Sequence, residues 1–339
     1  MSEMNKKFKV GVIGCGRISV MHLVSIASLE NTELVACCDK VKEKAEAAAK
    51  EYGGRAYTSY EEMFECEELD AVHICLPHYM HSDVAIYAMR HGLDVITEKP
   101  MDIDIESAKK AVAVAKETGR KFGVIFQCRY NDASQLVKQA LDSGKLGKVI
   151  SARSTLTWFR PDDYYEDSDW KGTWDKEGGG VVIDQAIHSI DLVRWLIDSD
   201  VESVSCNMAN RGHSSVIVED TAEGFITFKN GAKYGFWCMN NYACDEPIEI
   251  KLFCEHGKVT FNYTDALISY SDGTSEEAHK ASQKTKGKEY WGNSHSRQIS
   301  NFYRACLGLE ALEIDGSEAL KTHRLICELY DKGGMRNKL

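Results

Sequence analysis

The first 128 residues alternate short apolar runs with segments of helical spacing, and this order restricts the fold more than any other feature of the chain. Apolar runs that favour strands lie at 8–13, 32–39, 70–77, 93–100 and 121–128. Segments rich in helix formers separate them, at 17–29, 41–52, 80–91 and 104–118. Strands that are apolar throughout are buried on both faces, and parallel strands need crossover helices. The pattern therefore predicts an α/β domain with a doubly wound parallel sheet.

The pattern changes after residue 128. A helix is expected at 131–143, and a Gly-rich stretch that ends at 180 leads into another helix. From 201 to 272 consecutive strands are separated by Asn-Gly, His-Gly and Asp-Gly pairs, which mark hairpin turns. A polar loop is expected at 274–290, and helices at 293–308 and 316–333. The sequence thus predicts a Rossmann-type domain at 1–128 and an α+β domain at 129–339 with a large, mostly antiparallel open sheet. We expect the last helix to pack back on the first domain.

Charge and composition exclude several classes of function. The chain has 41 Lys and Arg against 52 Asp and Glu, a formal net charge of −11. This balance argues against nucleic-acid and membrane partners, because phosphate contacts need clustered basic residues. No signal-peptide pattern and no membrane-spanning stretch are visible, which favours a cytoplasmic protein. The 12 cysteines include no C-x-x-C pair, so no metal site is expected.

A glycine-rich turn follows the first apolar run. Gly14 and Gly16 fit a G-x-G-x-x-[small] pattern in which Ser19 takes the third position. The first glycine permits a tight turn, the second lets a pyrophosphate approach the backbone, and the helix that follows offers N–H groups to the phosphates. Asp39 ends the second run, where a carboxylate would accept hydrogen bonds from the adenosine ribose. Its charge favours NAD over NADP; the alternative for Asp39 is a helix N-cap before residue 41.

Three further stretches carry polar groups where strands or helices end. His78 and His81 follow one strand in "CLPHYMH", and Lys99 follows another in "TEKP". Ligands bind at the carboxyl ends of the strands in such sheets. Asp184 and His188 are four residues apart in "GGGVVIDQAIHSID", so one helical face would carry both. The alternatives are ordinary ones: a polar strand end, a solvent-exposed lysine and a polar helical pair.

Taken together, "VGVIGCGRIS", "LPHYMH", "EKP", "GGGVVIDQAIHSIDLVRWL" and "HSRQISNF" resemble the Gfo/Idh/MocA family, the relatives of glucose–fructose oxidoreductase and inositol dehydrogenase. The resemblance covers essentially the whole chain. It implies a nicotinamide cofactor and oxidation or reduction at a sugar or cyclitol carbinol carbon. The catalytic group that it implies is Lys99, Asp184 and His188. The cofactor contacts that it implies are Gly14, Gly16, Arg17, Ile18, Asp39, Lys40, Leu76, Pro77, His78, His81, Glu98, Lys99 and Gln127. The substrate contacts that it implies are Lys99, Arg129, Trp158, Trp170, Asp184, His188 and His295.

The expected chemistry is an NAD-dependent dehydrogenase reaction on a secondary alcohol of a sugar, glycoside or cyclitol. Such a reaction needs a base for the hydroxyl proton, and an imidazole such as that of His188 titrates near neutral pH. Lys99 either stabilises negative charge on the reacting oxygen or is itself the base, and the sequence leaves both roles open. Two other functions stay open as well: a dihydrodiol or imine reductase on this fold, and a non-catalytic sensor of NAD and sugar. An exposed sheet face also predicts a homodimer or homotetramer through the second domain.

Overall fold

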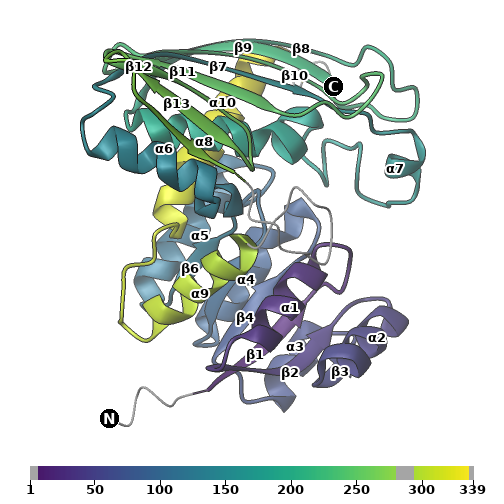
Figure 1. The fold of residues 1–339 in the computed structure, drawn as a ribbon. Helices are drawn as coiled ribbons and strands as arrows, with labels where there is room; N and C mark the ends of the chain where they lie inside the picture. The colour runs from purple at the N-terminus through teal and green to yellow at the C-terminus, as the bar shows by residue number, and fades with distance from the viewer. Residues whose placement is uncertain (1–6, 280–293, 336–339) are drawn as a thin grey trace. The chain divides into compact units, whose positions relative to one another are not determined.

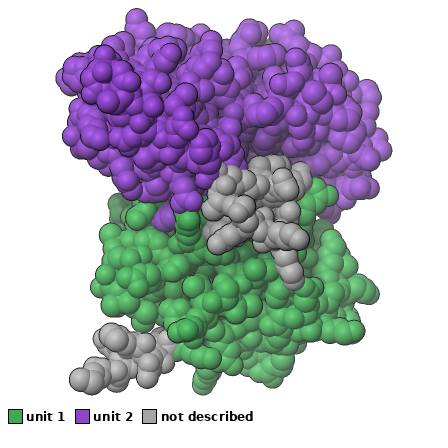
Figure 2. All heavy atoms as spheres, in the orientation of Figure 1, with its two compact units in different colours: residues 1–127, 285–321 green, residues 128–284, 322–339 purple. Residues whose placement is uncertain are grey.

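The computed structural model describes residues 7–279 and 294–335. The chain forms two compact units, which Figure 2 shows in different colours. Unit 1 comprises residues 1–127 and 285–321, and unit 2 comprises residues 128–284 and 322–339. Each unit is built around its own sheet.

Unit 1 contains a six-stranded sheet in the order β3-β2-β1-β4-β5-β6, and every pair of neighbouring strands is parallel. This order is that of a dinucleotide-binding Rossmann sheet, so the predicted doubly wound fold is confirmed. The strands are β1 (Phe8–Ile13), β2 (Thr32–Cys38), β3 (Arg55–Tyr57), β4 (Ala71–Ile74), β5 (Asp94–Thr97) and β6 (Phe122–Val124).

The helices of unit 1 lie close to the expected segments (Figure 1). They are α1 (Ser19–Ser28), α2 (Lys42–Tyr52), α3 (Tyr60–Cys66), α4 (His81–Arg90), α5 (Ile105–Thr118) and α9 (Ser294–Cys306), with 3-10 turns η2 (His78–Met80) and η3 (Gln127–Tyr130), the latter crossing into unit 2. The sequence pattern predicts no element between 53 and 69, where β3 and α3 form. The strand β3 has only three residues, two of them exposed, so it shows no apolar run that a pattern would detect.

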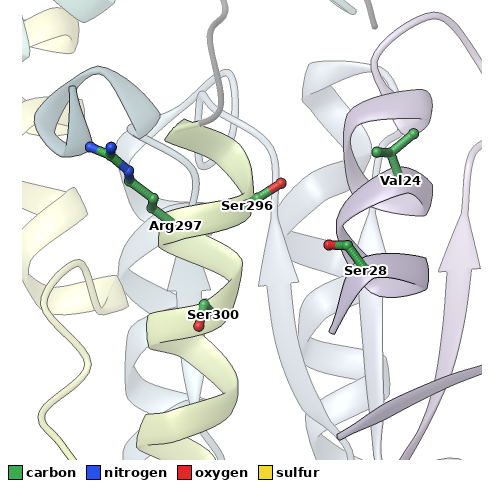
Figure 3. A pocket seen from close by; sticks show the side chains of 5 residues that line it. All are labelled: Val24, Ser28, Ser296, Arg297 and Ser300. Atoms are coloured by element: carbon green, nitrogen blue, oxygen red, sulfur yellow. The ribbon is translucent and has the colours of Figure 1, made fainter. Parts of the chain in front are cut away.

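Helix α9, distant in sequence, completes the core of unit 1. Ile299, Phe302 and Tyr303 belong to the same apolar cluster as residues of β1 and α1. The side chain of Gln298 binds the backbone of β6 and the residue after it, accepting from the Phe126 N–H at 3.0 Å and donating to the Val124 carbonyl at 2.7 Å. Between α1 and α9 lies an open groove, and Figure 3 shows the side chains that line it: Val24, Ser28, Ser296, Arg297 and Ser300.

Unit 2 contains an eight-stranded sheet in the order β14-β13-β12-β11-β7-β10-β9-β8. Only the central pair β7 and β10 is parallel, so the predicted mostly antiparallel sheet is confirmed. The strands are β7 (Val149–Thr157), β8 (Val201–Ala209), β9 (Thr221–Phe228), β10 (Lys233–Met239), β11 (Glu249–Cys254), β12 (Gly257–Phe261), β13 (Ala266–Tyr270) and β14 (Ser275–Ala278).

The loop expected at 274–290 is wrong for its first residues, because β14 pairs with β13 there. The strand reads Ser-Glu-Glu-Ala, and its charged, polar residues show no apolar alternation. Edge strands are often charged in this way, which hides them from a hydrophobic pattern. Residues 280–290 of the expected loop lie outside the described residues.

One face of the sheet in unit 2 is covered by helices. Helices α6 (Asp132–Asp142) and α8 (Ile187–Ile197) contact strands of this sheet and each other. The remaining helices are α7 (Asp163–Glu166), the π-helical turn η4 (Val182–Ala186) and α10 (Gly316–Gly333), which begins in unit 1 and continues in unit 2. Within the described ranges, none of the helices combines the length and the apolar character that a bilayer crossing requires.

Candidate functional site

The turn between β1 and α1 has the geometry that a phosphate-binding loop requires. Gly14 has a φ of 92°, and a Cβ there would lie 2.3 Å from the carbonyl oxygen of Cys75, so only glycine fits. At Gly16 a Cβ would meet nothing within 4 Å, which leaves the backbone open to a ligand. Helix α1 then begins without a side-chain cap at Ile18. Uncapped N–H groups beside an open glycine fit a pyrophosphate.

The carboxylate of Asp39 lies at the end of β2, directly beside this turn. One oxygen accepts the N–H of Cys15 at 2.8 Å, and the other accepts the N–H of Val41 at 2.9 Å. Helix α2 begins at Lys42 with Val41 as its N-cap, so Asp39 does not cap that helix. The alternative that the sequence left open is therefore wrong. Of the other residues expected here, Arg17 and Lys40 are exposed and Ile18 is partly buried.

Lys99 follows β5 at the same edge of the sheet. Residues 95–102 are all buried except Lys99, which is partly exposed. A buried strand thus delivers one cationic side chain to the carboxyl edge of the sheet, where ligands of such folds bind. The backbone N–H of Lys99 also donates to the carboxylate of Glu98 at 3.2 Å.

Glu98 is buried and surrounded by histidines of unit 1. Its Oε1 lies 3.0 Å from Nε2 of His22 on α1 and 3.4 Å from Nε2 of His295 on α9. Burial opposes the charge of this carboxyl group, but the hydrogen bond with His22 and the nearby His295 outweigh it and hold the pKa of Glu98 well below its usual range. His295 thus lies against Glu98, within unit 1.

The strand ends beside Glu98 are joined by His81. Its ring nitrogens lie 2.6 Å from the Pro100 carbonyl oxygen and 2.7 Å from the Leu76 carbonyl oxygen, so each nitrogen faces a backbone acceptor and the N–H of a neutral ring binds one of the two. The ring of His78 is buried and lies 6.0 Å from that of His81, while Leu76 and Pro77 are partly exposed.

Two buried oxygens near this edge point to a ligand. Within the described part of the chain, Oγ1 of Thr97 and Oε1 of Gln127 have no hydrogen-bond partner. Thr97 ends β5 and Gln127 follows β6. Buried polar atoms are nearly always paired, so these two fit groups that a bound cofactor would supply.

Unit 2 presents the second set of expected catalytic residues. From residue 181 to 194 every residue is buried except Asp184 and His188, which are partly exposed. Asp184 lies in the π-helical turn η4 rather than in an α-helix, and His188 lies in the first turn of α8. Such π turns often occur at functional sites. The expected α-helical pair is therefore corrected: a π-helical turn precedes the α-helix and carries Asp184.

The carboxylate of Asp184 is held by three polar neighbours. Its Oδ2 accepts the hydroxyl of Tyr164 at 2.8 Å and the side-chain amide of Gln185 at 2.8 Å. The ammonium of Lys171 lies 3.6 Å from the same oxygen, and it also hydrogen-bonds the Tyr164 hydroxyl. Burial and the charge of Asp184 together raise the pKa of Tyr164 well above its usual range. The hydroxyl therefore stays protonated and donates a hydrogen bond to Asp184.

The three glycines at 178–180 let the backbone approach a buried carboxyl group. Glu219 accepts the N–H of Gly180 at 3.0 Å, the N–H of Val182 at 3.1 Å and the hydroxyl of Tyr330 at 2.6 Å. A Cβ on Gly179 would lie 2.0 Å from the Tyr330 hydroxyl oxygen, and no side chain fits there. The Gly-rich stretch therefore positions η4 on Glu219.

The remaining expected substrate residues have structural contacts. The guanidinium of Arg129 is buried and forms a bidentate pair with Asp191, with distances of 2.8 and 2.6 Å. The indole of Trp158 is buried and donates to the carbonyl of Glu246 at 3.2 Å. Trp170 is partly exposed, close to Lys171. Within the described ranges, no group of three His, Cys, Asp or Glu side chains is arranged to hold a metal ion.

Several polar residues beside the expected ones were not predicted from the sequence. His22, His73 and Tyr303 lie behind Glu98, and Lys171 lies beside Asp184. A histidine within the otherwise apolar strand β4 is the one signal that could have been noticed, because a buried imidazole needs partners. No local pattern connects His22 to Tyr303, which are 281 positions apart in the chain.

Comparison with known proteins gives a consistent result for both units. Residues 8–126 match the family model "Oxidoreductase family, NAD-binding Rossmann fold", and residues 134–260 match the model "GFO/IDH/MocA C-terminal domain". The chain is 30% identical to scyllo-inositol 2-dehydrogenase (NAD(+)) of Bacillus subtilis (strain 168), over 68% of this chain and 66% of that protein. It is 27% identical to 1,5-anhydro-D-fructose reductase of Ensifer adhaerens, over 65% of this chain and 66% of that protein. It thus spans just under two thirds of the length of these relatives.

A solved structure matches along nearly the whole length. The WlbA dehydrogenase from Bordetella pertussis, in complex with NADH and UDP-GlcNAcA, is similar with a TM-score of 0.84 and 29% sequence identity. The match covers 98% of each chain.

The buried carboxyl group of Glu219 predicts a pH dependence of stability. Burial, opposed by hydrogen bonds from Tyr330 and the backbone, raises the pKa of Glu219 from 4.5 to about 7. The folded protein therefore holds a proton that the unfolded chain has lost, and this contribution to stability disappears as the pH rises from about 4.5 to about 7. Over this window Glu219 should lower the free energy of unfolding by about 3 kcal/mol.

In Glu219→Gln this loss should be absent, because the amide does not titrate. Urea unfolding at a series of pH values measures the difference between the two proteins, and Glu202→Gln, exposed on β8, is the control. Parallel pH profiles for wild type and Glu219→Gln would contradict the prediction.

Proposed function

Because the chain belongs to the Gfo/Idh/MocA family of oxidoreductases, we propose that it is an NAD-dependent dehydrogenase acting on a secondary alcohol of a sugar, glycoside or cyclitol. The observation that carries the proposal is Lys99. It is the one partly exposed residue in an otherwise buried strand end, at the edge of the sheet where Rossmann folds bind nicotinamide cofactors.

NAD fits the residues of unit 1. The turn at Gly14 and Gly16 and the uncapped start of α1 would hold the pyrophosphate, and Asp39 would accept the hydroxyls of the adenosine ribose. A carboxylate at that position disfavours a 2′-phosphate, which supports NAD over NADP. The unpaired oxygens of Thr97 and Gln127 would accept hydrogen bonds from the other end of the cofactor.

The side chains of Lys99, Asp184 and His188 would handle the substrate and its proton. When bound, the nicotinamide ring accepts or donates a hydride. The ammonium of Lys99 stabilises negative charge on the substrate oxygen, and the imidazole of His188 exchanges the hydroxyl proton. Asp184, held by Tyr164 and Lys171, accepts hydrogen bonds from a neighbouring hydroxyl of the substrate. If His188 is not the base, Lys99 takes this role as well.

The substrate class is supported by the relatives. Their names include an inositol dehydrogenase, an anhydrofructose reductase and a dehydrogenase solved with a sugar nucleotide. In this proposal residues 1–128 supply the cofactor contacts and 129–339 most substrate contacts, with Trp170 beside Lys171 as an aromatic surface for a sugar ring.

The direct test is turnover. Purified protein is mixed with NAD and a panel of cyclitols, hexoses and glycosides, and NADH formation is followed by absorbance at each substrate. A dehydrogenase reduces NAD with at least one polyol. A protein that binds NAD and a sugar without turnover would be a sensor, and this result would contradict the proposal.

Lys99→Ala should lower kcat roughly 100- to 10,000-fold, because the substrate oxygen loses its charged partner. The dissociation constant of NAD should change little, since backbone and carboxylate contacts hold most of the cofactor. Lys229→Ala is the control, because this lysine is exposed and pairs with Asp200 on the surface of unit 2. Near-normal kcat in Lys99→Ala would overturn the assignment.

The two glycines of the turn should respond differently to a methyl group. Gly14→Ala should destabilise the protein by several kcal/mol, on the order of the strain and clash that a Cβ at positive φ creates. Gly16→Ala should leave the melting temperature unchanged, because its Cβ meets no protein atom, yet weaken NAD binding at least about tenfold. Calorimetric titration together with thermal melting separates the two effects, and unaltered NAD affinity in Gly16→Ala would argue against a pyrophosphate there.

We also propose that the uncovered sheet face of unit 2 joins two copies of the chain. The strand register places Phe225, Trp237, Phe253 and Leu267 on one face, and each is between 38 and 48% exposed. Apolar side chains that gather on a sheet face mark an interaction surface. In a two-fold dimer the same surface patch of both copies forms the interface.

The variant Phe225→Glu/Trp237→Glu should dissociate the assembly, with the dissociation constant rising at least about 30-fold. Light scattering after size exclusion measures the mass, and circular dichroism confirms the fold. Leu309→Glu, also an exposed apolar residue but in unit 1, is the control and should keep the wild-type mass. A wild-type protein that is monomeric at micromolar concentration would reject this interface.

A further inference from the structure

A series of hydrogen-bonded, buried side chains leads from Glu98 into the core of unit 1. Nε2 of His22 lies 3.0 Å from Oε1 of Glu98, and Nδ1 of His22 lies 2.8 Å from Nδ1 of His73. Nε2 of His73 lies 2.7 Å from the hydroxyl of Tyr303. The side chains come from α1, β4, the residue after β5, and α9, and all are buried. None of these contacts involves the residues proposed to touch the substrate.

The groups at the two ends, Glu98 and Tyr303, decide which nitrogen of each histidine donates a hydrogen bond. Burial lowers the pKa of both His22 and His73, so each ring is neutral and carries one N–H. If Glu98 is charged, His22 must donate from Nε2, and its Nδ1 must accept from Nδ1 of His73. The Nε2 of His73 is then an acceptor, and the Tyr303 hydroxyl is its donor. Every bond in the series is satisfied in this single arrangement.

The opposite arrangement requires a neutral Glu98. His73 would then donate to Tyr303, His22 would donate to His73, and the bare Nε2 of His22 would face the carboxyl group. That nitrogen repels a carboxylate and binds only its protonated form. Burial raises the pKa of Tyr303 well above its usual range, so its hydroxyl stays protonated and is available as the donor to His73. The arrangement that starts with Tyr303 as donor therefore favours a charged Glu98.

Glu98 lies at the carboxyl end of β5, in the half of the sheet away from Asp39 and β2. In a Rossmann sheet the adenosine lies at the β2 end and the nicotinamide over the other half. The oxidised nicotinamide ring carries a positive charge that the reduced ring lacks. A carboxylate at that end therefore attracts the two redox forms unequally.

We propose that Tyr303, His73 and His22 are positioning residues that hold Glu98 as a fixed carboxylate at the nicotinamide end of the site, and that this charge raises the affinity for NAD⁺ relative to NADH. The inference rests on the proposed cofactor site. It adds a role for residues that contact neither cofactor nor substrate, and it makes the ratio of the two dissociation constants the quantity that they control.

The test is to measure the dissociation constants of NAD⁺ and NADH separately, by calorimetry and by NADH fluorescence. Tyr303→Phe removes one hydroxyl and no packing volume, and it leaves His73 without its donor. The dissociation constant of NAD⁺ should rise roughly three- to tenfold, the range of a single hydrogen bond, while that of NADH stays within about twofold. Tyr234→Phe is the control: it removes a buried hydroxyl that bonds Ser154 in unit 2, and the ratio should not change.

A pair of substitutions at His22 gives an independent measurement. His22→Leu removes the donor to Glu98 and should change the ratio at least as much as Tyr303→Phe. His22→Gln keeps an N–H close to the position of Nε2 and should restore most of the wild-type ratio. If His22→Leu does not fold, Tyr303→Phe alone decides the matter.

The pH dependence of the ratio provides a second readout. Besides His22, the groups that face Glu98 are His295 on α9, His81 on α4 and Cys75 after β4. In wild type the ratio should not respond to Glu98 near neutral pH, because its pKa lies well below the usual range. In Tyr303→Phe the loss of NAD⁺ affinity should begin at a higher pH than in wild type as the solution is acidified.

The outcomes are distinct. Equal losses for NAD⁺ and NADH in Tyr303→Phe, or no change in the ratio in any variant, would show that the series has a structural role only and would overturn the inference. A wild-type protein that binds neither redox form would contradict the proposed cofactor site itself, and with it this inference.

Discussion

A charged carboxylate buried in unit 1 imposes the strictest condition on this structure. Burial makes the charge of Glu98 unfavourable by several kcal/mol unless it is paired, on the order of the penalty for an isolated buried ion. Two histidines from different helices and a backbone N–H meet that requirement. Helix α9 packs against β5 and α1, although its sequence lies about 200 residues beyond β5 and more than 260 beyond α1. The same packing leaves Lys99 as the partly exposed residue of the strand end.

Unit 2 also contains buried carboxyl groups, which are stabilised by other partners. Glu219 is buried among N–H groups of a glycine stretch and the hydroxyl of Tyr330, and Asp184 is held by Tyr164 and Lys171. A π-helical turn joins these contacts to α8, and it places Asp184 and His188 as the accessible residues of a buried segment. In both units a strongly buried element thus presents a small number of polar side chains. This arrangement limits the conformational freedom of the side chains, and pre-organised sites require such a limit.

The two units also differ in how their sheets are covered. In unit 1 helices follow the strands along the chain, because parallel strands need crossover connections. The sheet of unit 2 has helices on one face, and the other face carries exposed aromatic side chains between charged ones such as Arg153 and Glu249. Aromatic side chains and arginine are enriched at interfaces between protein molecules. Both units match models of the same family, whereas assembly is proposed for unit 2 alone.

The sequence by itself predicted the class of each sheet and the glycine turn. It also indicated Asp39, Lys99, Asp184 and His188 as candidate site residues, because these signals are local. Apolar runs, glycine spacing and residues at strand ends act within a few positions of the chain. Only the tertiary structure decided which hydrogen-bond partners the polar side chains have. That Asp39 binds the Cys15 N–H, that Arg129 pairs with Asp191, and that His22 and Tyr303 connect through His73 all depend on contacts between distant segments. Short polar strands such as β3 and β14 escaped notice for the same reason, since pairing with a neighbour rather than their own composition makes them strands.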